Sequence, residues 1–469
     1  MSKSRDLKIE EEDDQEKGND FLRIWSNRAV FVMALLFSCG GQARADLWVT
    51  GYYPGWEQGA MPASTLDFTA LTHVIHFAVV PNSNGTLNSS VNVVSVGNSA
   101  NIVTNAHNAG RKVLICIGGA STQAGFQGAT SSANLSSFIS NIVSFMTTRG
   151  YDGVDLDWEP LDPADVAQFA NLVNGLRAAL NGMSPRPLLT AAIASPPAPA
   201  SLIASLQSQF DQINLMTYDL SGPYPGWVTW FNAPIYDGGY RFPSTGGLVP
   251  SADGMINSLI AAGVPANKLG IGVAFYGWLW NGGTGTSTGG SALPRQSWTT
   301  APTTSTLAHN GIMSSYYQPS RYRWDTNAQS AYLTIDNSGS TNDLFISYDD
   351  ERTCQTKVSY ARNRRLGGVM IWELAQDHQA GRADPLLQSI KQALATPGNA
   401  AIDFTGSNVD LTFATMPLGS YRILWTSNLA QPGWNTLVTT NVPGTGGLLH
   451  VSDPNTTQST RFFKVQTPP

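Results

Sequence analysis

Cysteine, histidine and charged residues are all scarce in this chain of 469 residues. Three cysteines, with no Cys-x-x-Cys pair, do not make a disulfide framework, and six scattered histidines argue against a zinc site. Only 13% of the residues are charged, and a net charge of −6 gives no reason to expect nucleic acid or an anionic membrane as a partner. The sequence therefore predicts neither a metal nor another cofactor.

The N-terminal region also lacks an apolar run long enough to span a membrane. Residues 29–37 are apolar but too few, and residues 43–45 (Ala-Arg-Ala) fit a small-x-small cleavage site. The acidic residues 10–16 are unusual ahead of a signal peptide. We expect residues 1–45 to be a leader and signal peptide cleaved near Ala45. The mature protein would be secreted, extracellular or periplasmic, without membrane contact.

Short apolar runs alternate with amphipathic stretches through most of the chain. The strand candidates are residues 47–52, 72–79, 112–117, 152–157, 187–193, 211–217, 269–275 and 366–372. The helix candidates include residues 132–149, 163–180, 251–263 and 352–364. Eight such units predict an α/β fold, a (β/α)8 TIM barrel. A doubly wound sheet is the alternative, but no GxGxxG or GxxxxGK[ST] pattern follows a first strand.

Composition changes suggest where the barrel is interrupted and where it ends. We expect a barrel domain over residues 46–393 with an inserted lobe at about 277–343, because so long a loop without structure is uncommon. Residues 394–400 read as a linker. Short alternating strands follow, which predict a small all-β module of unknown role over residues 401–469.

The most informative segment is the acidic run that ends the fourth predicted strand. Asp155, Asp157 and Glu159 alternate with apolar residues, so a strand places their three carboxyls on one face. Crowded, poorly hydrated carboxyls raise each other's pKa, which keeps one of them protonated near neutral pH. A Ca²⁺ site or a solvated loop is the other reading, but a Ca²⁺ loop favours Gly, Asn and Asp between its ligands.

Other polar and aromatic residues follow the ends of further predicted strands, where a barrel carries its active site. Tyr218 and Asp219 follow the sixth strand, and Trp372 ends the eighth. Tyr52 and Phe77 belong either to the barrel core or to its mouth. Tyr276 and Trp278 either line the cleft or pack under the lobe. The abundance of aromatic residues, 13 Trp and 15 Tyr, suits a neutral sugar ligand, although a large barrel also buries many rings.

These motifs together resemble the family 18 glycoside hydrolases, the chitinase family. The matching pieces are Gly51-Tyr52-Tyr53, Cys116-Ile117-Gly118-Gly119, Asp152-x-x-Asp155-x-Asp157-x-Glu159, Met216-x-Tyr218-Asp219, Gly263-Val264-Pro265 through Lys268-Leu269, Phe275-Tyr276-Gly277, Tyr348-Asp349-Asp350 and Gly368-x-Met370-x-Trp372-Glu373. They occur in the family's order over residues 47–380. The acidic run is highly specific, whereas the others are weak singly and strong together.

The resemblance implies a role for each matched position. Glu159 would be the general acid and then the base for water, Asp157 would orient the substrate's N-acetyl group, and Asp155 would tune Asp157. Tyr218 would donate to the N-acetyl carbonyl. The remaining residues implied to bind substrate are Trp372, Asp219, Met216, Tyr53, Phe77, Trp158 and Tyr276. Asp152, Gly118 and Gly119 are expected to be structural.

The resemblance therefore implies a secreted chitinase that cleaves β-1,4-linked N-acetylglucosamine polymers with retention, assisted by its substrate. We expect chitin or chito-oligosaccharides as the partner and a monomeric protein. An endo-β-N-acetylglucosaminidase acting on N-glycans shares the acidic run and stays open. A non-catalytic lectin is disfavoured because Glu159 is present.

Overall fold

The computed structural model describes twelve stretches of the chain. These are residues 21–25, 47–194, 199–337, 341–379, 384–394, 401–405, 408–414, 420–427, 433–437, 442–443, 448–453 and 460–466. The chain divides into two compact units, Gly41–Leu394 and a second one made of Met1–Gly40 with Ala395–Pro469. The expected cleavage site and the expected linker, apart from residue 394, lie outside the described residues.

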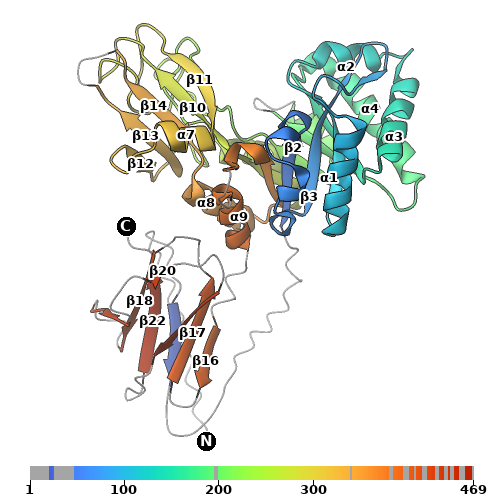
Figure 1. Cartoon of the computed structure of the whole chain (residues 1–469). Coiled ribbons are helices and arrows are strands. Elements are labelled where there is room, and N and C mark those ends of the chain that lie inside the picture. Colours follow the sequence, from blue (N-terminus) through green and yellow to red (C-terminus); the bar gives the residue numbers. More distant parts are fainter. Residues whose placement is uncertain are drawn as a thin grey trace, which may run out of the picture. The chain divides into compact units, whose positions relative to one another are not determined.

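Eight parallel strands of the larger unit form a closed barrel, as the sequence predicts (Figure 1). They are β2 (Trp48–Pro54), β3 (His73–Pro81), β5 (Lys112–Gly119), β6 (Gly153–Trp158), β7 (Leu188–Ile193), β8 (Gln212–Leu215), β9 (Leu269–Ala274) and β15 (Gly368–Trp372). Each strand pairs with the next one in this order, and β15 pairs with β2 to close the ring. A short strand β4 (Leu87–Asn88) extends β3.

Helices follow most of these strands and cover the outside of the barrel (Figure 1). They are α1 (Val96–Asn108), α2 (Gln123–Ala129), α3 (Leu135–Arg149), α4 (Val166–Asn181), α5 (Ala200–Leu206), α6 (Ala252–Ala261), α8 (Glu351–Asn363) and α9 (Pro385–Leu394). Local chemistry sets several of their ends. Ser95 caps α1 and Asp350 caps α8 through side-chain oxygens that accept backbone N–H groups, while Gly150 ends α3 in the left-handed conformation.

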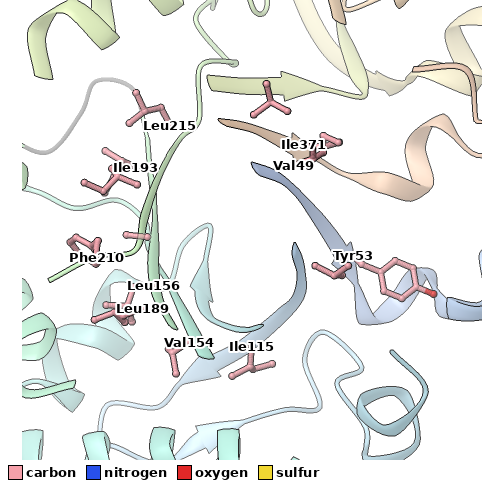
Figure 2. Close-up of a cluster of buried hydrophobic side chains, with 14 of the residues drawn as sticks. Val49, Tyr53, Ile115, Val154, Leu156, Leu189, Ile193, Phe210, Leu215 and Ile371 are labelled. Atoms are coloured by element: carbon pink, nitrogen blue, oxygen red, sulfur yellow. The ribbon is translucent and has the colours of Figure 1, made fainter. Parts of the chain in front are cut away.

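Strand alternation sorts the apolar side chains of the barrel into two sets. One set points outward and packs against the helices. Figure 2 shows part of it, with Tyr53, Val154, Leu156 and Ile371 around the outside of the strands. A separate, smaller cluster lies inside the barrel. Because most of the apolar side chains point outward, the inner faces of the strands can also carry the polar groups of a site.

The insertion before the eighth barrel strand is an antiparallel sheet with one short helix. Its members are β10 (Tyr276–Asn281), β11 (Thr303–Ala308), α7 (His309–Ser315), β12 (Tyr322–Asp325), β13 (Ser330–Ile335) and β14 (Leu344–Tyr348). The strand order is β11-β10-β14-β13-β12. The sheet runs to Tyr348, past the predicted end near residue 343, because β14 must return alongside β10 before the chain re-enters the barrel.

The second unit is all-β, as expected for the C-terminal module. Its strands are β1 (Phe21–Trp25), β16 (Ala401–Thr405), β17 (Asn408–Ala414), β18 (Ser420–Thr426), β19 (Asn435–Thr436), β20 (Val442–Pro443), β21 (Leu448–Asp453) and β22 (Thr460–Gln466). Strand β1, which falls in the expected leader, pairs antiparallel with β22. Within the described part of the chain, no helix has the length and apolar character to cross a membrane.

Candidate active site

The acidic run lies on β6 and projects into the barrel. Asp155 and Asp157 are buried on its inner face, and Glu159 follows at its C-terminal end. The neighbouring strand β5 approaches closely at Gly118 and Gly119, both with positive φ. A Cβ atom on Gly118 would lie 1.9 Å from the carbonyl oxygen of Asp157. Glycine is therefore required where β5 supports the acidic strand end.

Asp155 is held by neighbours within the barrel. Its Oδ2 accepts from the Tyr52 hydroxyl at 2.8 Å, and its Oδ1 accepts from Thr190 Oγ1 at 2.5 Å. Burial raises the pKa of Asp155, and hydrogen bonds from Thr190, Tyr52 and Cys116 oppose that rise. Asp155 is thus fixed directly below Asp157 on the same strand face, and its charge raises the pKa of Asp157.

Asp157 and Glu159 form a pair of hydrogen-bonded carboxyl groups. Burial raises the pKa of Asp157 well above its usual range, and the charges of Glu159 and Asp155 add to the rise. Burial also raises the pKa of Glu159; the bond to Asp157 opposes this, and the charge of Asp219 adds to it. A hydrogen bond between two carboxyl groups needs a proton on one of them, so the pair titrates together and retains a proton above the ordinary range.

Asp219 and two tyrosine side chains, which follow β8 or lie on β10, surround the carboxyl pair. The Tyr218 hydroxyl lies 3.5 Å from Met370 Sδ, and its ring meets that of Tyr276 edge-on at 5.9 Å. Burial raises the pKa of Tyr218, and the charge of Asp157 adds to it, so the hydroxyl stays a proton donor. Trp278 Nε1 donates to Asp219 Oδ1 at 2.7 Å. The lobe thereby contributes Tyr276 and Trp278 to the site.

A cluster of aromatic side chains forms one side of the barrel mouth. The rings of Trp372 and Phe77 meet edge-on with centroids 4.7 Å apart, and Tyr52 lies 5.6 Å from Trp372. Trp56, which is 44% exposed, contacts Phe77 at 5.8 Å. Trp56 also lines a cavity of about 430 Å³. Met216 packs against the same inner cluster. Aromatic surface therefore leads from the barrel interior to its rim.

Two residues expected to bind substrate do not face the site, and these predictions are wrong. Trp158 is buried on the outer face of β6, where it stacks on Phe126 at 4.5 Å and meets Phe169 edge-on. Tyr53 is buried in the same outer core, and its hydroxyl donates to the carbonyl of Met61. In both cases the strand alternation turns the side chain away from the barrel interior.

Asp152 lies at the opposite end of β6 from the carboxyl pair. It forms an ion pair with Lys112 at 2.7 Å, lies within hydrogen-bonding distance of His107 Nε2 at 2.8 Å, and accepts from Val113 N. These contacts tie α1, β5 and β6 together at the end of the barrel away from the carboxyl pair.

Sequence reasoning missed some members of this site. The sequence does not decide whether Tyr52 belongs to the core or the mouth, and in the structure its hydroxyl donates to Asp155 Oδ2. No sequence motif indicates Asn232, whose Oδ1 accepts from Asp219 N at 2.9 Å. It comes from the long loop after β8, where no periodicity indicates a side-chain direction. The match of Gly51-Tyr52-Tyr53 to the family was the available signal for Tyr52.

The donor set suits acid–base chemistry at a neutral substrate. Among the described residues, no cluster of three or more His, Cys, Asp or Glu side chains has the arrangement of a metal site. Two neighbouring carboxyl groups with raised pKa values and a tyrosine hydroxyl converge in a barrel mouth lined by aromatic rings. Together with the closed barrel, they define the class as a barrel glycosidase.

Comparison with known proteins specifies the class further. Residues 49–377 match the family described as Glycosyl hydrolases family 18. The chain belongs to this family.

Similar proteins carry chitinase names. Chitinase A1 of Niallia circulans is 32% identical over 71% of this chain and 49% of its own length. A probable endochitinase of Caenorhabditis elegans is 32% identical over 60% and 48%. The chain thus spans about half the length of these two relatives. The solved class V chitinase from Nicotiana tobaccum is 26% identical over 75% of this chain and 99% of its own, with a TM-score of 0.60. A mutant of that enzyme was solved in complex with NAG4.

Proposed function

We propose that this chain is a chitinase that hydrolyses β-1,4-linked polymers of N-acetylglucosamine. The observation that carries the proposal is the hydrogen-bonded pair of Asp157 and Glu159 at the mouth of a family 18 barrel, with raised pKa values. The names of the relatives and the NAG4 complex of the related enzyme support chitin-type substrates. The exposed Trp56 and the half-buried Trp372 offer rings on which sugar faces stack.

In the proposed mechanism Glu159 acts first as an acid. It gives its proton to the glycosidic oxygen as the bond from that oxygen to the anomeric carbon breaks. The acetamido carbonyl oxygen of the same sugar forms a new bond to the anomeric carbon, so no enzyme carboxylate attacks carbon. Asp157 accepts from the acetamido N–H, and Tyr218 donates to the acetamido oxygen. Both groups hold the internal nucleophile in place.

The second step restores the enzyme. Glu159, now a carboxylate, takes a proton from a water molecule that attacks the anomeric carbon from the side the leaving group occupied. The acetamido oxygen leaves, and its electron pair returns to the carbonyl. Two inversions give net retention, so the first product has the β configuration.

We also propose that the protein is secreted. The support is the sequence alone: the short apolar run at 29–37 and the small-x-small pattern at 43–45. Amino-terminal sequencing of protein from the medium of the native host tests this, with Asp46 as the expected first residue.

The proposed substrate is tested by offering the protein chitin oligomers and an N-glycoprotein in parallel, with mass spectrometry of the products. We expect N-acetylglucosamine dimers and longer fragments from the oligomers and no release of intact glycans. Release of glycans instead would assign the protein to the endo-β-N-acetylglucosaminidases. Binding without any product would indicate a lectin. The Glu159→Gln variant serves as the control for contaminating activity.

A further inference from the structure

The inserted lobe joins the barrel through two chain crossings. The first runs from Ala274 at the end of β9 to Tyr276 at the start of β10. The second runs from Tyr348 at the end of β14 to Asp350, which caps α8. Since β10 and β14 pair side by side, with Gly277 opposite Tyr348, the two crossings are adjacent. A side chain that bonds to both crossings therefore fixes the position of the lobe on the barrel.

Asp349 is placed to hold both crossings. Its Oδ2 accepts from Ala274 N at 3.0 Å and from Lys357 Nζ at 2.6 Å. Lys357 lies on α8 and also donates to the carbonyl of Gly272 on β9 at 3.0 Å. Asp349 and Lys357 are 1% and 0% exposed. One buried ion pair therefore ties the lobe's entry, its exit, a barrel strand and a barrel helix together.

Stability alone does not explain an ion pair at this position. Removing two charges from water costs free energy, and apolar residues of similar volume often serve as well or better. Burial raises the pKa of Asp349, the Lys357 charge and hydrogen bond oppose the rise, and the charge of Asp350 adds to it. Cys354 and Tyr276 also feel the charge of Asp349. The pair supplies directional bonds at fixed points of β9, which apolar residues do not supply.

The side chains that the lobe contributes to the candidate active site follow directly after the first crossing. Tyr276 is the first residue of β10, and Trp278 follows two positions later on the same strand. Trp278 Nε1 donates to Asp219 Oδ1 at 2.7 Å, and the charge of Asp219 also acts on the Tyr276 hydroxyl. The charge of Asp219 in turn raises the pKa of Glu159. The ion pair is therefore linked to the proposed acid through β10, Trp278 and the charge of Asp219.

We propose that Asp349 and Lys357 are positioning residues for the candidate active site. Their ion pair sets the lobe so that Trp278 holds Asp219 where its charge acts on Glu159. The proposal rests on the proposed hydrolysis for its kinetic consequence, but its structural consequence is measurable without turnover. Neither residue of the ion pair touches the substrate.

The direction of the expected effect follows from the charges around Glu159. The ionisable groups that interact with it are Asp157, Asp219, Tyr218 and Cys116. If the lobe shifts, Asp219 loses its Trp278 donor and its fixed place, and the rise in the Glu159 pKa that it causes becomes smaller. The acid then loses its proton at lower pH, and the alkaline limb of activity moves to lower pH.

The test uses the full chain with Asp349→Asn and Lys357→Met combined, so that no buried charge is left alone. We expect kcat on a soluble chitin oligomer to fall about tenfold or more, with little change in KM, because small misplacements near reacting groups are costly. We expect the pKa of Glu159, read by carbon-13 NMR of the carboxyl and assigned with Glu159→Gln, to fall.

The matched control breaks another largely buried ion pair, Arg177 with Asp211, at 3.0 Å. Asp211 precedes β8 and accepts from Leu189 N, so it lies at the far end of the barrel from the site. We expect Arg177→Met with Asp211→Asn to lower the melting temperature while leaving the pKa of Glu159 and the pH profile unchanged.

The outcomes separate the two proposals. A folded Asp349→Asn/Lys357→Met variant with an unchanged Glu159 pKa overturns the positioning role, whether or not the wild type turns over chitin oligomers. A wild type without turnover but with a pKa shift in the variant overturns the proposed function only. If the double variant does not fold, Lys357→Arg decides: its broader head group should displace Asp349 and lower the Glu159 pKa, and an unchanged value overturns the role.

Discussion

At the scale of single residues, the candidate site depends on carboxyl groups that are kept from ionising fully. Asp155 and Asp157 lie on the inner face of β6 and Glu159 follows its end, and burial is the first cause of the raised pKa of each. Hydrogen-bond donors on two strands stabilise the ionised form of Asp155. A proton retained by the three carboxyl groups is therefore held by Asp157 or Glu159. Burying these carboxyl groups lowers the stability of the folded protein, but it keeps the proton that the proposed chemistry needs.

Replacing the proposed acid isolates its role. We expect Glu159→Gln to lose nearly all turnover of chitin oligomers, by about 10³-fold or more, because an amide does not donate a proton to the leaving oxygen. Binding measured by calorimetry should persist. Asp152→Asn is the control, since Asp152 lies at the other end of the same strand and pairs with Lys112. It should lower stability and keep turnover; an active Glu159→Gln protein would remove Glu159 as the acid.

Burial also raises the pKa of a carboxyl group outside the Asp157–Glu159 pair, that of Glu373. It is 2% exposed, follows Trp372, and accepts from Ala375 N at 2.9 Å. Burial raises its pKa to about 8, the hydrogen bond opposes the rise, and the charge of Glu57 adds to it. The neutral form therefore predominates in the folded protein at neutral pH.

The consequence is a stability that falls as pH rises. Because the folded-state pKa of Glu373 is raised, its favourable contribution is full below the ordinary glutamate pKa and is lost as pH rises towards 8. We expect Glu373→Gln, compared with the wild type, to gain relative stability between pH 5 and 8, by a few kcal/mol at most, at about 1.4 kcal/mol per pKa unit. Denaturant unfolding at several pH values measures this. A difference independent of pH would contradict the burial of an ionisable carboxyl.

At the scale of elements, adjacent strands must approach closely to bring the carboxyls to the barrel mouth. Gly118 has φ +121°, and its ideal Cβ lies 1.9 Å from the Asp157 carbonyl oxygen. We expect Gly118→Ala to destabilise the protein by roughly 3 kcal/mol or more, through strain and backbone displacement. Gly59→Ala is the control, because nothing lies within 4 Å of its Cβ, and it should change stability by less than about 0.5 kcal/mol. Equal melting temperatures would contradict the packing described.

Element type was predictable from the sequence, whereas side-chain direction at strand ends was only partly so. Apolar runs located all eight barrel strands, because strands packed on both faces need continuous apolar residues. The alternation that placed Asp155 and Asp157 inward also places Trp158 outward, and the prediction for Trp158 ignored it. Tyr52 and Tyr53 are neighbours with opposite directions, and only the barrel shows which faces in.

The lobe was predictable as an insertion and Tyr276 as a substrate-binding residue, whereas the place of Trp278 was open. The register of β10 against β14 decides which side chains meet Asp219. Such long-range antiparallel pairing leaves no periodic signal across the intervening loop. The ion pair of Asp349 with Lys357 was hidden for the same reason, since the Tyr348-Asp349-Asp350 motif does not indicate a partner for Asp349.

At the scale of the whole molecule, the chain forms two compact units, and the barrel unit contains every member of the candidate site. We expect a chain ending after Leu394 to fold and to keep its turnover of soluble oligomers, because the barrel core is made within that unit. Circular dichroism and kinetics of the truncated protein test this. Loss of most turnover in a folded truncation would show that the C-terminal module is part of the hydrolase.

The central claim is hydrolysis with help from the substrate's own acetamido group, and product stereochemistry tests it most directly. Proton NMR during the first minutes of cleavage of a chitin oligomer should show the β anomer as the first reducing end. The fully de-N-acetylated oligomer should remain uncut under the same conditions. An α anomer as the first product, or equal cleavage of the de-N-acetylated oligomer, would contradict the roles given to Asp157, Glu159 and Tyr218.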